Sequence, residues 1–170
     1  MTHPGNALHS LQKFLSCSLL ALVLALCTSP SQAQTCTATA VAPAFGVYSP
    51  SGGNTFANGV VSVSCNVLGV VPISVFYTIR LGLGSQPTGQ QRQLAGGPGG
   101  AGRLQYNLYC DSGYTQVWAD GSASSCVVSG GQALLLGSLL TPHPVYGLII
   151  SGQYVSAGSY SDVIAVDVLY

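Results

Sequence analysis

Apolar and polar positions alternate along much of the chain, most clearly in residues 159–170, SYSDVIAVDVLY. Ile164, Val166, Val168 and Tyr170 share one side of an extended strand, and the residues between them fall on the other side. This period of two predicts a half-buried β-strand with one apolar face.

Further apolar runs, rich in β-branched and aromatic residues, predict more strands. They cover residues 37–48, 59–67, 71–84, 103–111, 131–140 and 145–152. Asn58-Gly59 and Asp120-Gly121 are tight-turn signals, and the glycine-rich residues 96–102 predict a flexible loop. In residues 34–170, Gly and Pro interrupt nearly every stretch that could form three helical turns, and the predicted fold of these residues is an all-β sandwich of short strands.

Residues 1–33 have the pattern of a signal peptide. Lys13 precedes the apolar residues 14–27, and small residues at positions 31 and 33 place a cleavage site before Gln34. The apolar run is shorter than the roughly 20 residues that span a bilayer. Leu26 stands before Cys27, where a lipid-attachment motif has a small residue. We therefore predict an exported domain, residues 34–170, without a stable membrane anchor.

The cysteines of the predicted mature domain indicate disulfides. An even number of cysteines in an exported chain favours disulfide bonds over metal binding, and no C-x-x-C motif is present. Three pairings are possible, and proximity in sequence favours the first with the second and the third with the fourth. These residues are Cys36, Cys65, Cys110 and Cys126.

Charged residues make up only 5% of the chain. In the predicted mature domain they are Arg80, Arg92, Arg103, Asp111, Asp120, Asp162 and Asp167. This nearly neutral set gives no electrostatic attraction for nucleic acid or an anionic membrane. It also leaves little repulsion between copies, which favours association.

The sequence contains no pattern typical of catalysis, so we predict no enzyme activity and no catalytic, metal-binding or cofactor-binding residues. His143 lies between two prolines and is interpreted as a solvated loop side chain. Gly97, Gly99 and Gly102 match G-x-G-x-x-G, but Pro98 interrupts the match and a strand pattern follows where a dinucleotide site needs a helix.

Several stretches together resemble the spore coat protein U family, the pilin module of archaic chaperone–usher pili. They are CTATAVAPAFGVYSPSGG, VSVSC, LQYNLYCDSGYTQVWADGS and VYGLIISGQYVSAGSYSDVIAVDVLY, spread over residues 36–170. The resemblance implies an incomplete immunoglobulin-like β-sandwich that lacks its last strand. It also implies three kinds of partner: a periplasmic chaperone that lends a strand, an outer-membrane usher, and the other pilus subunits, which exchange strands.

On this resemblance, the apolar side of the last strand faces an acceptor groove and the first strand forms the opposite edge. The groove residues would be Ala44, Phe45, Val47, Ile164, Val166, Val168 and Tyr170. Asp162 shares the inward parity, so its carboxylate needs hydrogen-bond partners, such as turn backbone or a tyrosine hydroxyl.

The chain departs from polymerising pilins before its first predicted strand. Only Gln34 and Thr35 separate the predicted cleavage site from Cys36, whereas a donor strand needs about ten extended residues. We therefore expect a tip or minor subunit of a surface pilus, passing through the periplasm and serving attachment and biofilm formation. Two alternatives stay open: a coat protein, or a self-contained binding module that displays residues 82–102 as a ligand-binding loop.

Overall fold

The structure is a computed structural model that describes residues 34–67, 73–134 and 137–170. The predicted signal peptide, residues 1–33, lies outside the described residues. Within the described ranges, no helix is long and apolar enough to cross a membrane. The described elements all belong to one unit, Ala33–Tyr170.

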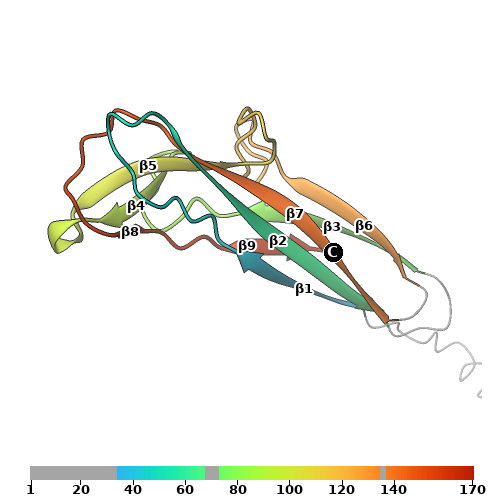
Figure 1. The fold of residues 1–170 in the computed structure, drawn as a ribbon. Coiled ribbons are helices and arrows are strands. Elements are labelled where there is room, and N and C mark those ends of the chain that lie inside the picture. The colour runs from blue at the N-terminus through green and yellow to red at the C-terminus, as the bar shows by residue number, and fades with distance from the viewer. Residues whose placement is uncertain (1–33, 68–72, 135–136) are drawn as a thin grey trace, which may run out of the picture. The chain divides into compact units, whose positions relative to one another are not determined.

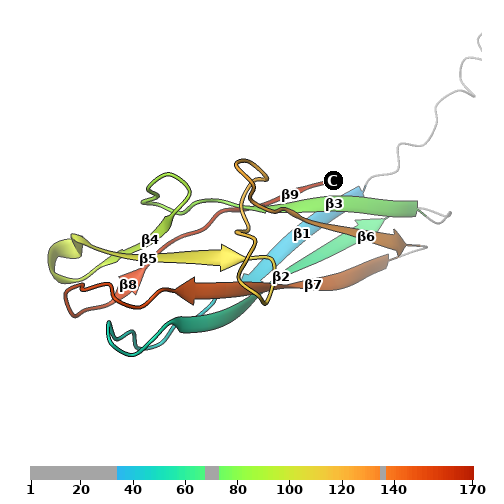
Figure 2. The same ribbon diagram turned by 90° about the horizontal axis from the view of Figure 1, so that it is seen from above.

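The described residues form β-strands, a single short 3-10 helix (η1) and loops. The elements are β1 (Gln34–Val41), β2 (Thr55–Val67), β3 (Ile73–Leu81), β4 (Arg92–Gly96), η1 (Pro98–Gly100), β5 (Gly102–Tyr109), β6 (Val128–Leu134), β7 (Gly137–Ile149), β8 (Tyr160–Ser161) and β9 (Val166–Leu169). A six-stranded sheet has the order β1-β2-β7-β5-β4-β8 and a three-stranded sheet the order β6-β3-β9 (Figures 1 and 2). The predicted all-β class is confirmed.

Alternate residues of both sheets form one apolar core. Val61, Val63 and Cys65 of β2 meet Tyr77 and Ile79 of β3 in this core, and each is almost completely buried. The β5 and β7 strands add Leu104, Tyr106, Leu108, Val145 and Ile149. The period-two pattern therefore places one face of each strand in the interior, as in a sandwich.

Both disulfides join the pairs that proximity in sequence favours. Cys36 and Cys65 are direct partners in the β1–β2 ladder and are bonded to each other. Cys110, at the end of β5, is bonded to Cys126, which closes the loop before β6. The second disulfide therefore fixes a long loop rather than the ends of a simple hairpin.

The turn predicted at Asn58-Gly59 is wrong, because both residues lie inside β2 and pair with Tyr146 and Val145. Glycine is needed here for close packing. A Cβ atom at Gly59 would lie 2.6 Å from the carbonyl oxygen of Val41, where the chain leaving β1 crosses β2. The Asp120-Gly121 turn is confirmed: Asp120 accepts hydrogen bonds from the backbone and hydroxyl of Ser122.

Residues 159–170 do not form the single strand that the alternation predicts. Tyr160 and Ser161 form β8 and pair with β4 in the six-stranded sheet, whereas β9 pairs with β3 in the other sheet. The alternation of burial nevertheless continues through residues 162–168, because the chain stays extended while it crosses from one sheet to the other. Local periodicity cannot reveal such a change of partner.

Residues 82–102 do not form one open loop. Arg92–Gly96 is strand β4, and Arg92 is completely buried. Its guanidinium donates hydrogen bonds to the carbonyl oxygens of Gly82 and Trp118, both at 2.7 Å, and burial lowers its pKa. Arg92 therefore cannot serve as an exposed ligand contact.

His143 is also not in a loop. It lies within β7 opposite Val61, and its Nε2 atom is 2.9 Å from the hydroxyl of Tyr77 on β3. The run predicted as one strand over residues 131–140 is divided between β6 and β7. Pro142 and Pro144 are two residues apart, so the N–H groups that they lack fall on the same edge of β7. The described ladders pair these positions with β2 alone, because β5 pairs only with residues 146–148.

Candidate functional site

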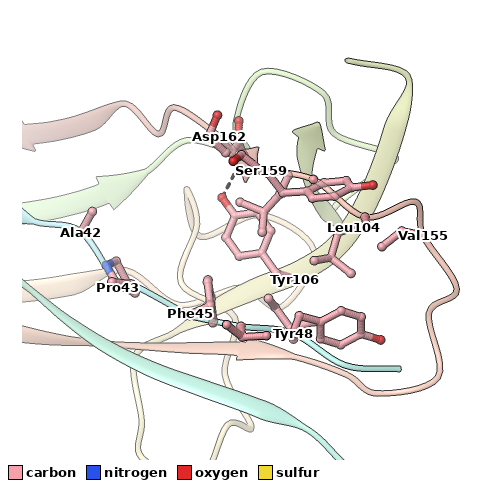
Figure 3. A pocket seen from close by; sticks show the side chains of 18 of the residues that line it. Ala42, Pro43, Phe45, Tyr48, Leu104, Tyr106, Val155, Ser159 and Asp162 are labelled. Atoms are coloured by element: carbon pink, nitrogen blue, oxygen red, sulfur yellow. Dashed lines mark hydrogen bonds between the residues drawn. The ribbon is translucent and has the colours of Figure 1, made fainter. Parts of the chain in front are cut away.

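A cavity of about 790 Å³ opens on the inner side of the six-stranded sheet (Figure 3). One wall is the chain after β1, residues 42–50, and the other is the chain before β9, residues 155–164. The floor comes from β4, β5 and β7, through Leu94, Leu104, Tyr106, Leu108 and Ile149. The lining is mostly aliphatic and aromatic.

The first wall is extended but belongs to neither sheet. β1 ends at Val41, and Pro43 follows, which has no N–H group to continue a ladder. Gly46 then adopts a positive φ of 71°, which turns the chain between Phe45 and Tyr48. The first strand predicted over residues 37–48 is therefore confirmed only as far as Val41. Residues 42–48 form the wall of the cavity instead.

Phe45 connects this wall with the floor. Its ring packs edge-on against Tyr106, with centroids 5.8 Å apart. It also covers Gly147 of β7, where a Cβ atom would lie 2.8 Å from the ring. Glycine at this position therefore makes room for Phe45 beneath the cavity.

Asp162 fixes the second wall where the chain crosses between the sheets. Its carboxylate accepts hydrogen bonds from the backbone and hydroxyl of Ser85 at 2.8 and 2.7 Å and from the Tyr106 hydroxyl at 2.8 Å (Figure 3). Burial alone would raise the pKa of Asp162, but these bonds outweigh it and hold the pKa below its ordinary value. Burial and the bond to Asp162 raise the pKa of Tyr106. The expected partners of an inward aspartate are confirmed.

Tyr48 ties the first wall to the chain after β7. Its hydroxyl accepts a hydrogen bond from the Gln153 amide at 2.8 Å and donates to the Gln153 carbonyl at 3.2 Å. The side chain of Gln153 in turn accepts from the backbone N–H of Gln105 and donates to its carbonyl. Gln105 lies opposite Gln93 of β4, but the described β5–β7 ladder covers only residues 107–109 of β5. The Gln153 side-chain amide therefore supplies the hydrogen bonds of the Gln105 backbone.

The two walls of the cavity continue into strands at the edges of their sheets. β1 is the first strand of the six-stranded sheet, and β9 is an outer strand of the three-stranded sheet. Ala38 and Ala40 of β1 pair with the buried Val63 and Val61, so they face the interior side of the sheet, yet both are exposed. The interior is thus uncovered along β1.

The predicted groove residues occupy three kinds of position. Ala44, Phe45, Val47 and Ile164 line the cavity, although Val47 is 95% exposed. Val166 and Val168, in β9, are half-buried and pack against the core. Tyr170 is 53% exposed. Whether these residues receive a partner's strand stays a prediction.

Sequence reasoning did not identify the cavity floor. Tyr106 and Leu108 lie within the YNLY stretch that carries the family resemblance, and their inward parity with Leu104 was a usable signal. Phe45, Tyr48, Tyr160 and Asp162 come from the other stretches of that resemblance and also line the cavity. The stretches that resemble the family thus converge on one place.

The site offers apolar contact rather than chemistry. No group of three or more His, Cys, Asp or Glu residues in the described ranges could hold a metal ion. Among the ionisable groups that line the cavity, Asp162 and Tyr106 are bonded to each other. The hydroxyls of Tyr48 and Tyr160 donate to the backbone carbonyls of Gln153 and Ser156. What the arrangement can do is bury apolar side chains supplied from outside.

Comparison with protein-family models gives a match over most of the chain. A model of the Spore Coat Protein U domain matches residues 22–167, which is more than half of the chain. No curated protein matches the chain. The matched range includes both walls and the floor of the cavity.

Proposed function

Because the chain belongs to the Spore Coat Protein U family, we propose that it is a structural subunit of a chaperone–usher surface pilus, assembled by donor-strand complementation. The domain is associated with pilus subunits and with coat proteins, and the family is structural rather than enzymatic. The observation that carries the proposal is the apolar cavity between residues 42–50 and residues 155–164.

Strand addition explains both the cavity and the edges. A partner strand beside β9 and β1 would pair with exposed backbone groups, and its alternate side chains would enter the apolar lining. A periplasmic chaperone would supply this strand first, and another subunit would replace it at the outer-membrane usher. The immunoglobulin-like sandwich lacking one strand is part of the same proposal.

The start of β1 supports a position at the end of the fibre. Gln34 and Thr35 are already paired with Val67 and Asn66 in the β1–β2 ladder. If cleavage occurs before Gln34, no residues are left over to form a donor strand. The subunit would then accept a strand without giving one, as a tip or minor subunit serving attachment and biofilm formation. Mass spectrometry of the mature N-terminus tests this step, and a start well before Gln34 would contradict it.

A matched pair of variants tests the acceptor role. Ile164 lines the cavity, whereas its neighbour Val163 is 79% exposed. Ile164→Asp should abolish the complex formed on periplasmic co-expression with a pilus chaperone, because a carboxylate cannot be buried against an apolar strand. Val163→Asp should leave the yield of complex unchanged. Equal yields for both variants would contradict strand acceptance in this cavity.

A further inference from the structure

A second surface lies on the outer face of the six-stranded sheet, away from the cavity. The antiparallel registers place Tyr146 of β7 beside Asn58 of β2 and Tyr109 of β5. The neighbouring row places Leu148 of β7 beside Phe56 of β2 and Asn107 of β5. Aromatic rings and side-chain amides therefore alternate across three strands.

Tyr114, from the loop between β5 and β6, lies over these rows. Its ring centroid is 5.0 Å from that of Phe56, 5.6 Å from that of Tyr109 and 6.3 Å from that of Tyr146. Phe56 is 54% exposed. We call these four rings, with Asn58, Gln91, Gln105 and Asn107, the aromatic–amide face. In Figure 2 the loop that carries Tyr114 runs across β5 and β7.

The loop holds Tyr114 in a rare backbone conformation. Its φ is 55°, a region that non-glycine residues seldom occupy. The Asp111 carboxylate accepts hydrogen bonds from Thr115 and Gln116 on the far side of Tyr114, and the Cys110–Cys126 disulfide closes the loop. Backbone strain of this kind is concentrated at binding sites, where a fixed geometry is needed.

A hollow adjoins the rings. It has a volume of about 110 Å³ and shares Tyr109 with the ring cluster. Its lining combines four amide residues, two tyrosines and two aliphatic residues: Gln91, Gln105, Asn107, Gln153, Tyr106, Tyr109, Leu148 and Ile150. Apolar contact with a few directed polar groups is typical of small-ligand sites.

The chemistry of the face selects an uncharged, polar ligand. No residue of the aromatic–amide face carries a formal charge, and the nearby Asp111 is bonded within its own loop. Amides and phenols both donate and accept hydrogen bonds, as sugar hydroxyls require. Aromatic rings present flat apolar surfaces on which the C–H face of a pyranose can pack. Anionic ligands would find no cation here.

We propose that the aromatic–amide face binds neutral glycans. The subunit would then carry a ligand site of its own, on the side of the sheet away from the cavity. The proposal does not depend on strand complementation, since none of the four rings lines the cavity. Of residues 82–102, the predicted ligand-binding loop, the face includes Gln91, whereas Arg92 is buried.

Calorimetric titration of the subunit with cellohexaose, maltohexaose and mannohexaose tests the proposal, using its chaperone complex or, if the domain is soluble alone, the free monomer. At least one should bind, and Tyr114→Ala should weaken that binding at least tenfold. Tyr154→Ala is the matched control, because Tyr154 is 88% exposed and lies outside the face; it should bind like the wild type. Phe56→Ala provides a second variant on a regular strand if Tyr114→Ala alters the loop.

Three results would overturn the proposal. They are failure of all three oligosaccharides to bind, equal loss of binding in Tyr154→Ala, and self-association of the domain that Tyr114→Ala abolishes. The last would make the face a contact between copies. Because none of the four rings lines the cavity, Tyr114→Ala should form the chaperone complex in the same yield as the wild type. Loss of the complex in Ile164→Asp and loss of glycan binding in Tyr114→Ala are therefore separate outcomes.

Discussion

The interior of the domain has a filled half and a hollow half. In the filled half, Val63, Ile79 and Trp118 are completely buried, and the Trp118 indole donates a hydrogen bond to the Ile79 carbonyl at 3.1 Å. In the hollow half, Leu94, Val155 and Ile164 are only partly buried and line the cavity. The same apolar alternation supplies both halves, so the difference lies in what covers them.

The comparison indicates that the hollow half has its apolar residues but lacks an element of structure that would cover them. Protein interiors are normally packed to the density of organic crystals, with few voids larger than a water molecule. An apolar cavity of about 790 Å³ beside two sheet edges is outside that norm. The stability of the free domain should therefore depend on the filled half, and the stability of an assembled subunit on both halves.

The largest difference in stability is expected between the alanine variants of two isoleucines, one in each half of the interior. Ile79→Ala should reduce the free energy of unfolding by about 2–5 kcal/mol, because it removes a completely buried side chain. Ile164→Ala should cost about 1 kcal/mol or less, since Ile164 is only partly buried. Urea unfolding of both variants in the same purified form checks the difference. Equal losses would mean that the hollow half is as well packed as the filled half.

A smaller loss of stability is expected when the Asp162 carboxylate, which fixes the second wall of the cavity, is replaced. Asp162→Asn should reduce the free energy of unfolding by about 1–3 kcal/mol, because an amide presents a donor or a weaker acceptor to Ser85 and Tyr106. Since the pKa of Asp162 is lowered from 3.8, its contribution is present at neutral pH and is lost as the pH falls through the lowered pKa.

Measuring the free energy of unfolding from pH 7 to pH 2 checks the direction of this pH dependence. The difference between the wild type and Asp162→Asn should shrink below about pH 4, where the unfolded-state carboxyl begins to bind its proton. Asp111 and Asp120 also have lowered pKa values, but they contribute equally to both proteins. A difference that stays constant over this range would show that the charge of Asp162 does not hold the wall.

Local pattern predicts which residues of this protein are extended, and the core of β2, β3 and β5 follows from it. Pairing over long distances is not contained in that pattern. Gly59 resembles a turn signal because Pro43, which packs against it, is remote in sequence. The pattern of residues 159–170 predicts one strand because both sheets need the same alternation of apolar and polar residues. Arg92 reads as exposed because its carbonyl acceptors come from other segments.

The candidate site was predictable at its walls and not at its floor. Phe45 and Ile164 follow from strand parity together with the family resemblance, and both line the cavity. Leu94 belongs to β4, whose sequence and surroundings are rich in glycine and glutamine and do not show the pattern of a strand. Gln153 gives no sequence signal for its role, because it completes the hydrogen bonds of β5 with a side chain.

The smallest effect should come from the link between the first wall and Gln153. Tyr48→Phe removes a hydroxyl that bonds both the amide and the carbonyl of Gln153. The free energy of unfolding should fall by about 0.5–1.5 kcal/mol, because these groups are close enough to the surface to find water instead. Urea unfolding measures the loss, and Tyr154→Phe at an exposed tyrosine is the control. A loss as large as that of Ile79→Ala would contradict the division into two halves.

The most direct test of the open cavity is native mass spectrometry of residues 34–170 expressed in the periplasm, with and without a pilus chaperone, followed by thermal melting. The domain should be soluble in quantity only as a one-to-one complex, and it should melt at a lower temperature when the chaperone is removed. A monomer that is equally abundant alone and melts cooperatively at the same temperature would show that the sandwich is closed, and would contradict strand acceptance.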